Sequence, residues 1–249
     1  MKPLLRLLAL VLLAGLALQL YFAGRIGLMR VLNPESTAFQ RSEVYRIALT
    51  SGALKWRQQW VPYAAISEHL KRAIIASEDA SFTFHEGVDM KALEKAWEKN
   101  ARAEQRAAQL GSRLADSKAA MPAVKAPKII GGSTITQQLA KNLFLSGERN
   151  LPRKGQELLL TLMLEALLSK QRILEIYLNN VEWGDGVFGA EAAARHFFRK
   201  PASQLSANEA ARLAVMLPRP KYFETRAQSA YLAARARVIM VRMAGAEPP

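Results

Sequence analysis

The sequence contains no cysteine. This absence excludes disulfides, a thiolate nucleophile and cysteine-bound zinc. Histidine is scarce as well, since His69, His85 and His196 stand far apart and lack the spacing of metal ligands. A recurring strand pattern and an internal repeat are also missing, so the chain is expected to be mainly helical.

Acidic residues are outnumbered in this chain. There are 35 Lys and Arg against 21 Asp and Glu, which gives a formal net charge of +14. This balance favours an anionic partner, such as a nucleic acid, an acidic membrane surface or a phosphorylated substrate, although an inert basic surface has the same composition. The 249 residues, half of them hydrophobic, suffice for one domain of ordinary size plus a short extra segment.

Charge is absent from one N-terminal stretch. From Leu7 to Phe22 the sequence LLALVLLAGLALQLYF carries no charged residue, and the apolar run begins at Leu4. Such a run is just long enough to cross a bilayer core, which takes roughly 17 to 25 helical residues. A membrane anchor is the preferred interpretation; the alternatives are a cleaved signal peptide, with small residues at Gly15 and Ala17, and a buried core helix. Basic residues flank the run on both sides, so they leave its orientation open.

Helical signals recur along the rest of the chain. Residues 64–78 place four apolar side chains on one face: Ile66, Leu70, Ala73 and Ile74. Residues 153–180 form a long Leu-rich stretch of helical spacing, and residues 206–217 open with a capping box. Turn residues at 184–189 are expected to link two helices.

Residues 91–128 differ from their surroundings. The first part is rich in Ala, Lys, Arg, Glu and Gln but has few large apolar residues, so we expect an exposed or mobile helix. The last part, MPAVKAPK, is expected to be a proline-containing linker. A nucleic-acid-binding arm is the alternative, but interleaved aromatic residues are missing and acidic residues dilute the charge.

Two adjacent carboxylates, Glu78 and Asp79, form the first candidate site. They follow an apolar helical stretch and precede Phe82 and His85. Neighbours in a helix point about 100° apart, so one carboxylate is expected to face a cleft while the other braces the structure. A solvated helix end is the alternative.

The segment GGSTITQQLAKN forms the second candidate site. Thr134 and Gln137 make a capping box at the start of a helix, where free amides favour an anion. Gln137 and Lys141 are four residues apart, as are Gln138 and Asn142, so they form polar stripes along the helix. A glycine turn before a polar helix is the alternative, and the spacing of a phosphate-binding P-loop is missing.

Basic residues around a glutamate form the third candidate site: Arg149, Arg153, Lys154 and Glu157. A surface ion pair between Arg153 and Glu157 would contribute little. A basic wall oriented by an embedded carboxylate would instead stabilise the negative charge of a phosphate-bearing ligand.

These three sites carry a family resemblance. SEDASFTFHEG resembles the EDxxFxxHxG motif of the peptidoglycan glycosyltransferases, the family shared with class A penicillin-binding proteins. GGSTITQQLAKN is similar to the second motif of that family, and RKGQELLLTLMLE resembles the third, with Thr161 near an expected Ala. KQRILEIYLNN and, more loosely, ARARVIMVRM resemble the fourth and fifth. The resemblance covers residues 60–245 in order and extends to the monofunctional branch of the family.

The resemblance implies a reaction. The 4-hydroxyl of one lipid II attacks the anomeric carbon of a lipid-linked glycan, inverts it and expels a diphosphate-lipid. Glu78 would be the general base, Lys141 and Arg149 would hold the donor diphosphate, and Glu157 would position these cations or the donor sugar. The groove would be lined by Ser133, Thr134, Gln137, Gln138, Asn142 and Arg153, and the first motif would be supported by Asp79, Phe82 and His85. No cofactor is required and no dedicated metal site is expected, although the family leaves room for a divalent cation (Mg or Mn) near the substrate diphosphate.

The resemblance also implies an architecture. We expect a mainly α, lysozyme-like domain at 60–249 with a small membrane-proximal lobe, a transmembrane anchor within 1–23 and a connection at 24–59. The N-terminus would be cytoplasmic and the catalytic domain periplasmic, at a bacterial inner membrane. The expected partners are lipid II, the growing lipid-linked glycan, membrane lipids and other cell-wall synthesis proteins, and no nucleic acid.

One departure from the family concerns spacing. Glu78 and Gly131 lie 53 residues apart, about twenty more than the resemblance leads us to expect, so an insertion is predicted within 91–128. Two other functions stay open as alternatives: a lysozyme-like lytic enzyme that cleaves glycan strands, and a non-catalytic scaffold for wall synthesis.

Overall fold

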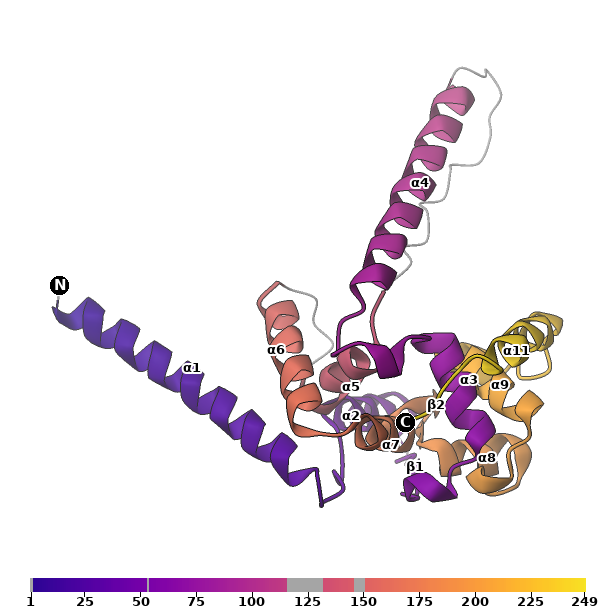
Figure 1. Cartoon of the computed structure of the whole chain (residues 1–249), viewed down its shortest axis with the longest axis horizontal. Helices are drawn as coiled ribbons and strands as arrows, with labels where there is room; N and C mark the ends of the chain where they lie inside the picture. The colour runs from indigo at the N-terminus through magenta and orange to yellow at the C-terminus, as the bar shows by residue number, and fades with distance from the viewer. Residues whose placement is uncertain (1, 53, 116–131, 146–150) are drawn as a thin grey trace.

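The structure is a computed structural model that describes residues 2–52, 54–115, 132–145 and 151–249 (Figure 1). It is mainly α, as predicted. The body contains the helices α2 (Ala38–Ser51), α3 (Glu68–Glu78), α5 (Ile135–Phe144), α6 (Leu151–Leu167), α7 (Lys170–Asn180), α8 (Ala190–Phe198), α9 (Ala207–Met216), α10 (Pro220–Glu224) and α11 (Ala230–Met243). Short 3₁₀ turns lie at Tyr63–Ala65, Phe82–Phe84 and Ala202–Gln204.

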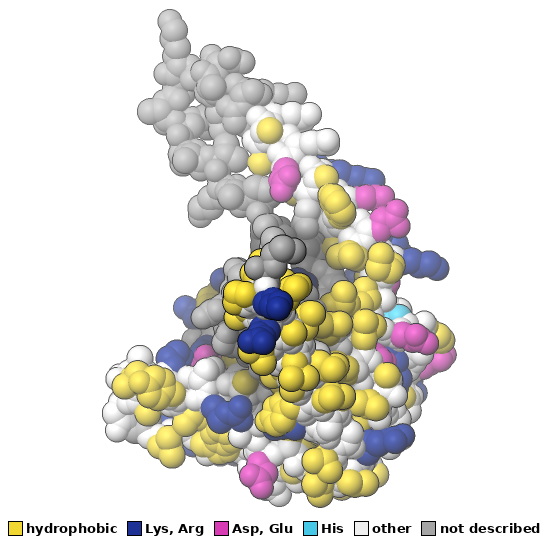
Figure 2. Space-filling view, turned by 90° about the vertical axis from the view of Figure 1, so that its left-hand side faces the viewer, with side chains coloured by type: hydrophobic (Ala, Val, Ile, Leu, Met, Phe, Trp, Pro, Cys, Tyr) yellow, Lys and Arg dark blue, Asp and Glu magenta, His cyan; other side chains and the backbone are white. Residues whose placement is uncertain are grey.

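The N-terminal helix α1 (Lys2–Leu28) projects from this body (Figure 1). Its most apolar stretch has a mean hydropathy of 2.2 and no buried residue, which excludes the core-helix interpretation and is consistent with a single-pass membrane anchor. Figure 2 views the molecule from the side on which α1 projects, and many hydrophobic side chains are exposed on the part that faces the viewer. The helix continues past residue 23, and Ile26 and Met29 are buried in the core of the body.

The core is built around α3. This helix packs against α9 and α11, while α5 packs against α2, α6 and α7. The apolar face predicted for residues 64–78 is confirmed, since all four of its side chains are buried. Both predicted capping boxes are also present, at Thr134 before α5 and at Ser206 before α9.

The helical spacing predicted for 153–180 is confirmed, but the stretch is divided into two helices. The helix α6 ends at Leu167, and Ser169 caps α7 by accepting a hydrogen bond from the Arg172 backbone amide. The turn residues at 184–189 lie between α7 and α8, as expected, and they also belong to a small sheet that was not predicted: β1 (Arg57–Gln58), β3 (Val187–Phe188) and β2 (Glu182–Gly184), in that order. Strands of two or three residues are too short to produce a visible alternation of polar and apolar side chains.

The helix α4 (Met90–Ala115) extends away from the body (Figure 1). Trp97 is 75% exposed, although Ala96 is buried near the base of the helix. The helix predicted for the first part of 91–128 is therefore confirmed as far as residue 115, and most of its side chains are exposed between residues 91 and 109. The predicted linker at 121–128 lies outside the described residues.

Candidate active site

A cleft of about 850 Å³ opens where α3, α4 and the start of α5 meet. Glu78 and Asp79 line it at the end of α3, and Ser133 and Thr134 line it just before α5. The first two sequence motifs therefore share one cleft, although 56 positions separate Asp79 from Ile135 along the chain.

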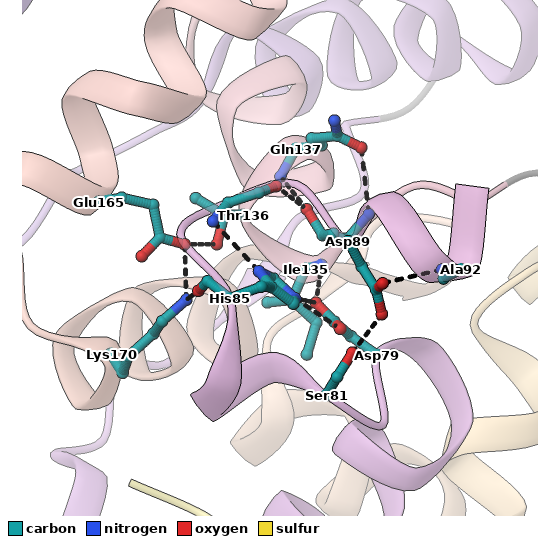
Figure 3. Close-up of polar contacts among 12 residues, drawn as sticks. Asp79, Ser81, His85, Asp89, Ala92, Ile135, Thr136, Gln137, Glu165 and Lys170 are labelled. Atoms are coloured by element: carbon teal, nitrogen blue, oxygen red, sulfur yellow. Dashed lines mark hydrogen bonds and ion pairs between the residues drawn. The ribbon is translucent and has the colours of Figure 1, made fainter. Parts of the chain in front are cut away.

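Asp79 braces this wall of the cleft. It is buried and accepts a hydrogen bond from the Ile135 backbone amide at 3.0 Å (Figure 3). His85 Nδ1 accepts a hydrogen bond from the Gly87 amide at 3.1 Å, so the network assigns the ring proton to Nε2, which donates to Asp79 Oδ1 at 2.9 Å. Asp79 thus ties the end of α3 to the start of α5, and Phe82 packs in the core beside the His85 ring.

Gly87 lies at the tightest point of this loop. Its φ of +85° is in the left-handed region, and a Cβ there would stand 2.6 Å from Cγ2 of Thr161 on α6. The Gly87 carbonyl accepts a hydrogen bond from the Thr134 hydroxyl at 2.6 Å. The glycine of the first motif therefore lets the loop contact both α5 and α6.

Glu78 faces the cleft in a different environment from Asp79. Gln138 Nε2 donates a hydrogen bond to its carboxylate at 3.0 Å, and Tyr177 of α7 donates its hydroxyl to Gln138 Oε1 at 2.9 Å. Burial raises the pKa of Glu78 above its ordinary value, while the hydrogen bond from Gln138 acts in the opposite direction and nearby Asp79 adds to the rise. Glu78 is thus a fixed carboxylate with enhanced proton affinity, a property that suits a general base.

A second polar network joins α5, α6 and α7 (Figure 3). Glu165 accepts hydrogen bonds from Thr136 at 2.6 Å and from Lys170 at 2.8 Å. Lys170 also donates to the His85 carbonyl and lies over the Phe82 ring, 4.6 Å from its centroid. This network fixes the loop of the first motif against the helices of the third and fourth.

Glu157 lies at the start of α6 and is only 5% exposed. It pairs with Arg153 at 3.3 Å and with Lys154. Because the carboxylate is buried between two cations, this contact differs from the surface ion pair between Arg153 and Glu157 that the sequence left open.

The other predicted site residues divide into three groups. Gln137 uses its side chain to cap its own helix by accepting from the Thr134 amide, so it does not point freely into a groove. Lys141 is exposed and Asn142 partly buried, both within two turns of Gln138 on α5. Arg149 lies outside the described residues.

The described residues offer no group of three or more His, Asp or Glu side chains close enough to hold a metal ion.

Known proteins of one family resemble this chain over most of its length. The profile of the family described as Transglycosylase matches residues 47–116 and 112–244. The chain belongs to this transglycosylase family. It is 52% identical to a biosynthetic peptidoglycan transglycosylase of Burkholderia thailandensis, covering 95% of this chain and 84% of that protein. Proteins of the same description from Herminiimonas arsenicoxydans and Paraburkholderia phytofirmans are 51% and 49% identical, covering 94% and 97% of this chain and 92% and 91% of theirs. The predicted enzyme class, a glycosyltransferase, is confirmed.

Several residues that shape this transglycosylase site were not singled out by the sequence: Thr136, Glu165, Lys170 and Tyr177. All four lie inside the family motifs, and their place in these motifs is the signal that could have identified them. Their roles depend on which helices pack together, and spacing along the chain does not reveal that.

Proposed function

We propose that this chain polymerises lipid II into linear glycan strands, with inversion at the anomeric carbon and release of a diphosphate-lipid. Family membership makes it a peptidoglycan glycosyltransferase of cell-wall synthesis. The observation that carries the finer proposal is the position of Glu78, which lines a cleft and is fixed to α5 through Gln138.

Glu78 would act as the general base. The attacking sugar hydroxyl is a weak nucleophile and must lose its proton as the glycosidic bond forms. The proton would pass to the Glu78 carboxylate, whose raised pKa strengthens it as an acceptor. Asp79 is less suited to this task because His85 and the Ile135 amide already occupy it.

The cations would act on the leaving group. A departing diphosphate is a weak base that needs positive charge more than a proton donor. Lys141 stands one helical turn from Gln138 on α5, which supports a diphosphate site next to the base. The resemblance to the family motifs gives Arg149 the same role of holding the donor diphosphate. Arg153 and Lys154, held by Glu157, would complete the basic wall on α6. A divalent cation, if used, would be bound chiefly by the oxygens of the substrate.

The cations near the base argue against the lytic alternative. A glycosidase expels a sugar alkoxide from a neutral glycan, which offers no diphosphate for cations to bind. Lys141 on α5, together with Arg153 and Lys154 held by Glu157 on α6, suits a diphosphate leaving group instead.

We also propose that α1 crosses the inner membrane from the cytoplasm and that the catalytic body is periplasmic. Contact between α1 and α6 supports a catalytic site near the membrane, where the lipid-linked substrate resides. Gln19 and Gln156 exchange hydrogen bonds at 2.9 and 3.1 Å across this contact. Exposed leucines on α6, at positions 158, 159 and 162, would add apolar contact with the lipid.

Replacing Glu78 with Gln tests the proposal. The change keeps the shape of the side chain but removes its basicity, so we expect polymerisation of labelled lipid II to fall at least about 100-fold. Gel analysis of glycan products measures the rate, and an unchanged thermal melting curve shows that the variant is folded. Activity within a few-fold of the wild type would contradict the assignment, and cleavage of preformed strands by the wild type would favour the lytic alternative.

A further inference from the structure

A row of lysines on α4 lines the same cleft as Glu78. Lys91, Lys95 and Lys99 follow one another at intervals of four residues, so they stand on one face of the helix. At 1.5 Å per residue the row spans about 12 Å. Arg242 of α11 adds a fourth cation to the lining of the cleft.

Nearby acidic side chains do not neutralise this row. Among the residues that the structure describes, no carboxylate forms an ion pair with Lys91, Lys95 or Lys99. The row is therefore available to an external anion, and its wide spacing suits several anionic groups along an extended molecule.

The acidic residues closest in sequence are otherwise engaged or face elsewhere. Glu98 pairs with Arg102 at 3.2 Å, and neither Glu94 nor Glu98 lines the cleft. Asp89, which does line it, is bonded to Ser81 and to the backbone of α4. The lysine side of the cleft therefore keeps its positive charge.

We propose that the α4 lysine row binds the oxyanions of the acceptor glycolipid and so guides its sugar hydroxyl to Glu78. This inference rests on the proposed function. Such an acceptor carries phosphate oxygens in its diphosphate and carboxylates in its peptide, and ammonium groups bind both. A span of about 12 Å matches three to four residues of an extended peptide.

The positions of the cations separate this row from the donor site. The lining of the cleft includes Glu78 and the α4 lysines but not Lys141, Arg153 or Lys154. An acidic membrane surface would also attract lysines, but a cleft shared with the general base favours the substrate.

The double variant Lys95→Gln/Lys99→Gln tests this proposal in the full-length protein. The matched control is Arg102→Gln/Arg106→Gln, which removes the same charge from the same helix outside the cleft. The donor is lipid II with its 4-hydroxyl capped, held at saturation, and the acceptor is ordinary lipid II at varied concentration. We expect the acceptor KM to rise about tenfold with kcat within about twofold, and the control to match the wild type.

Two further measurements, with an amidated acceptor and with anionic vesicles, identify the anion that is bound and test for binding to the membrane surface. An acceptor whose peptide carboxylates are amidated should abolish the difference between variant and wild type if the carboxylates are bound, and should preserve it if the diphosphate is bound. Unchanged KM in the lysine variant, with or without weaker flotation on anionic vesicles, would overturn the proposal.

Direct binding of fluorescent acceptor keeps the two proposals distinguishable. A wild type that binds the acceptor through these lysines but makes no glycan would contradict the proposed function alone. Unchanged binding and KM in an otherwise active lysine variant would contradict the lysine row alone.

Discussion

At the scale of residues, two adjacent carboxylates have acquired different properties from their surroundings. Asp79 receives hydrogen bonds from the Ile135 amide and from His85, which leave it little capacity for further chemistry. Glu78 faces the cleft with one amide donor, and burial raises its pKa. The sequence predicted this division of roles because successive helical residues point in different directions. It could not predict which partners produce it.

Gln138 is expected to set the pH range in which Glu78 works. Its amide favours the charged carboxylate, so Gln138→Leu should raise the pKa of Glu78 further. Because the base must be deprotonated, activity is lost as pH falls through that pKa, and the acidic limb of kcat/KM should move to higher pH. A pH–rate profile of glycan synthesis measures the shift.

Tyr177→Phe is the control for this effect. It removes the hydroxyl that orients Gln138 but keeps the amide bond to Glu78, so the limb should move less than in Gln138→Leu. An unchanged acidic limb in Gln138→Leu would show that Gln138 does not tune the base.

At the scale of elements, local signals were the most predictable. The apolar face of α3 and the capping boxes at Thr134 and Ser206 depend on neighbours within four residues, and all are present. The contact between Glu165 and Lys170 spans two helices, and its link to Thr136 depends on how these helices pack. The small sheet was not predicted for a related reason: β1 pairs with β3 across more than a hundred residues, although β2 and β3 are neighbours in the sequence.

Gly87 gives a test of the packing between the first motif and α6. Gly87→Ala would force a side chain into a left-handed backbone and within 2.6 Å of Thr161, so we expect a loss of about 2 to 4 kcal/mol in the free energy of unfolding. Adding Thr161→Ala removes the methyl that causes the clash but leaves the backbone strain. The double variant should therefore recover only part of the loss.

Urea unfolding of both single variants and the double variant measures this coupling. Thr161→Ala alone serves as the reference, because it also removes a hydrogen bond from the Thr161 hydroxyl to the Glu157 carbonyl. Strict additivity of the two changes would mean that Gly87 and Thr161 do not meet as described.

At the scale of the whole molecule, α1 is both an apolar projection and part of the core. Its first two-thirds are exposed, whereas Ile26 is fully buried and Met29 is 4% exposed within the core cluster. Arg172 of α7 donates to the Met29 carbonyl at 2.7 Å. The segment 26–29, at the end of α1, therefore fixes the apolar projection to the body, a feature that the apolar run in the sequence did not reveal.

Two deletions should separate these roles of α1. Removing residues 2–18 takes away the exposed apolar part, so the protein should no longer float with lipid vesicles, while its core stays complete. Removing residues 2–30 also takes away Ile26 and Met29, and burying two such side chains contributes about 3 to 5 kcal/mol. The longer deletion should therefore unfold at clearly lower urea concentration than the shorter one. Because both variants lack the exposed apolar part, equal urea midpoints would mean that the end of α1 does not stabilise the body.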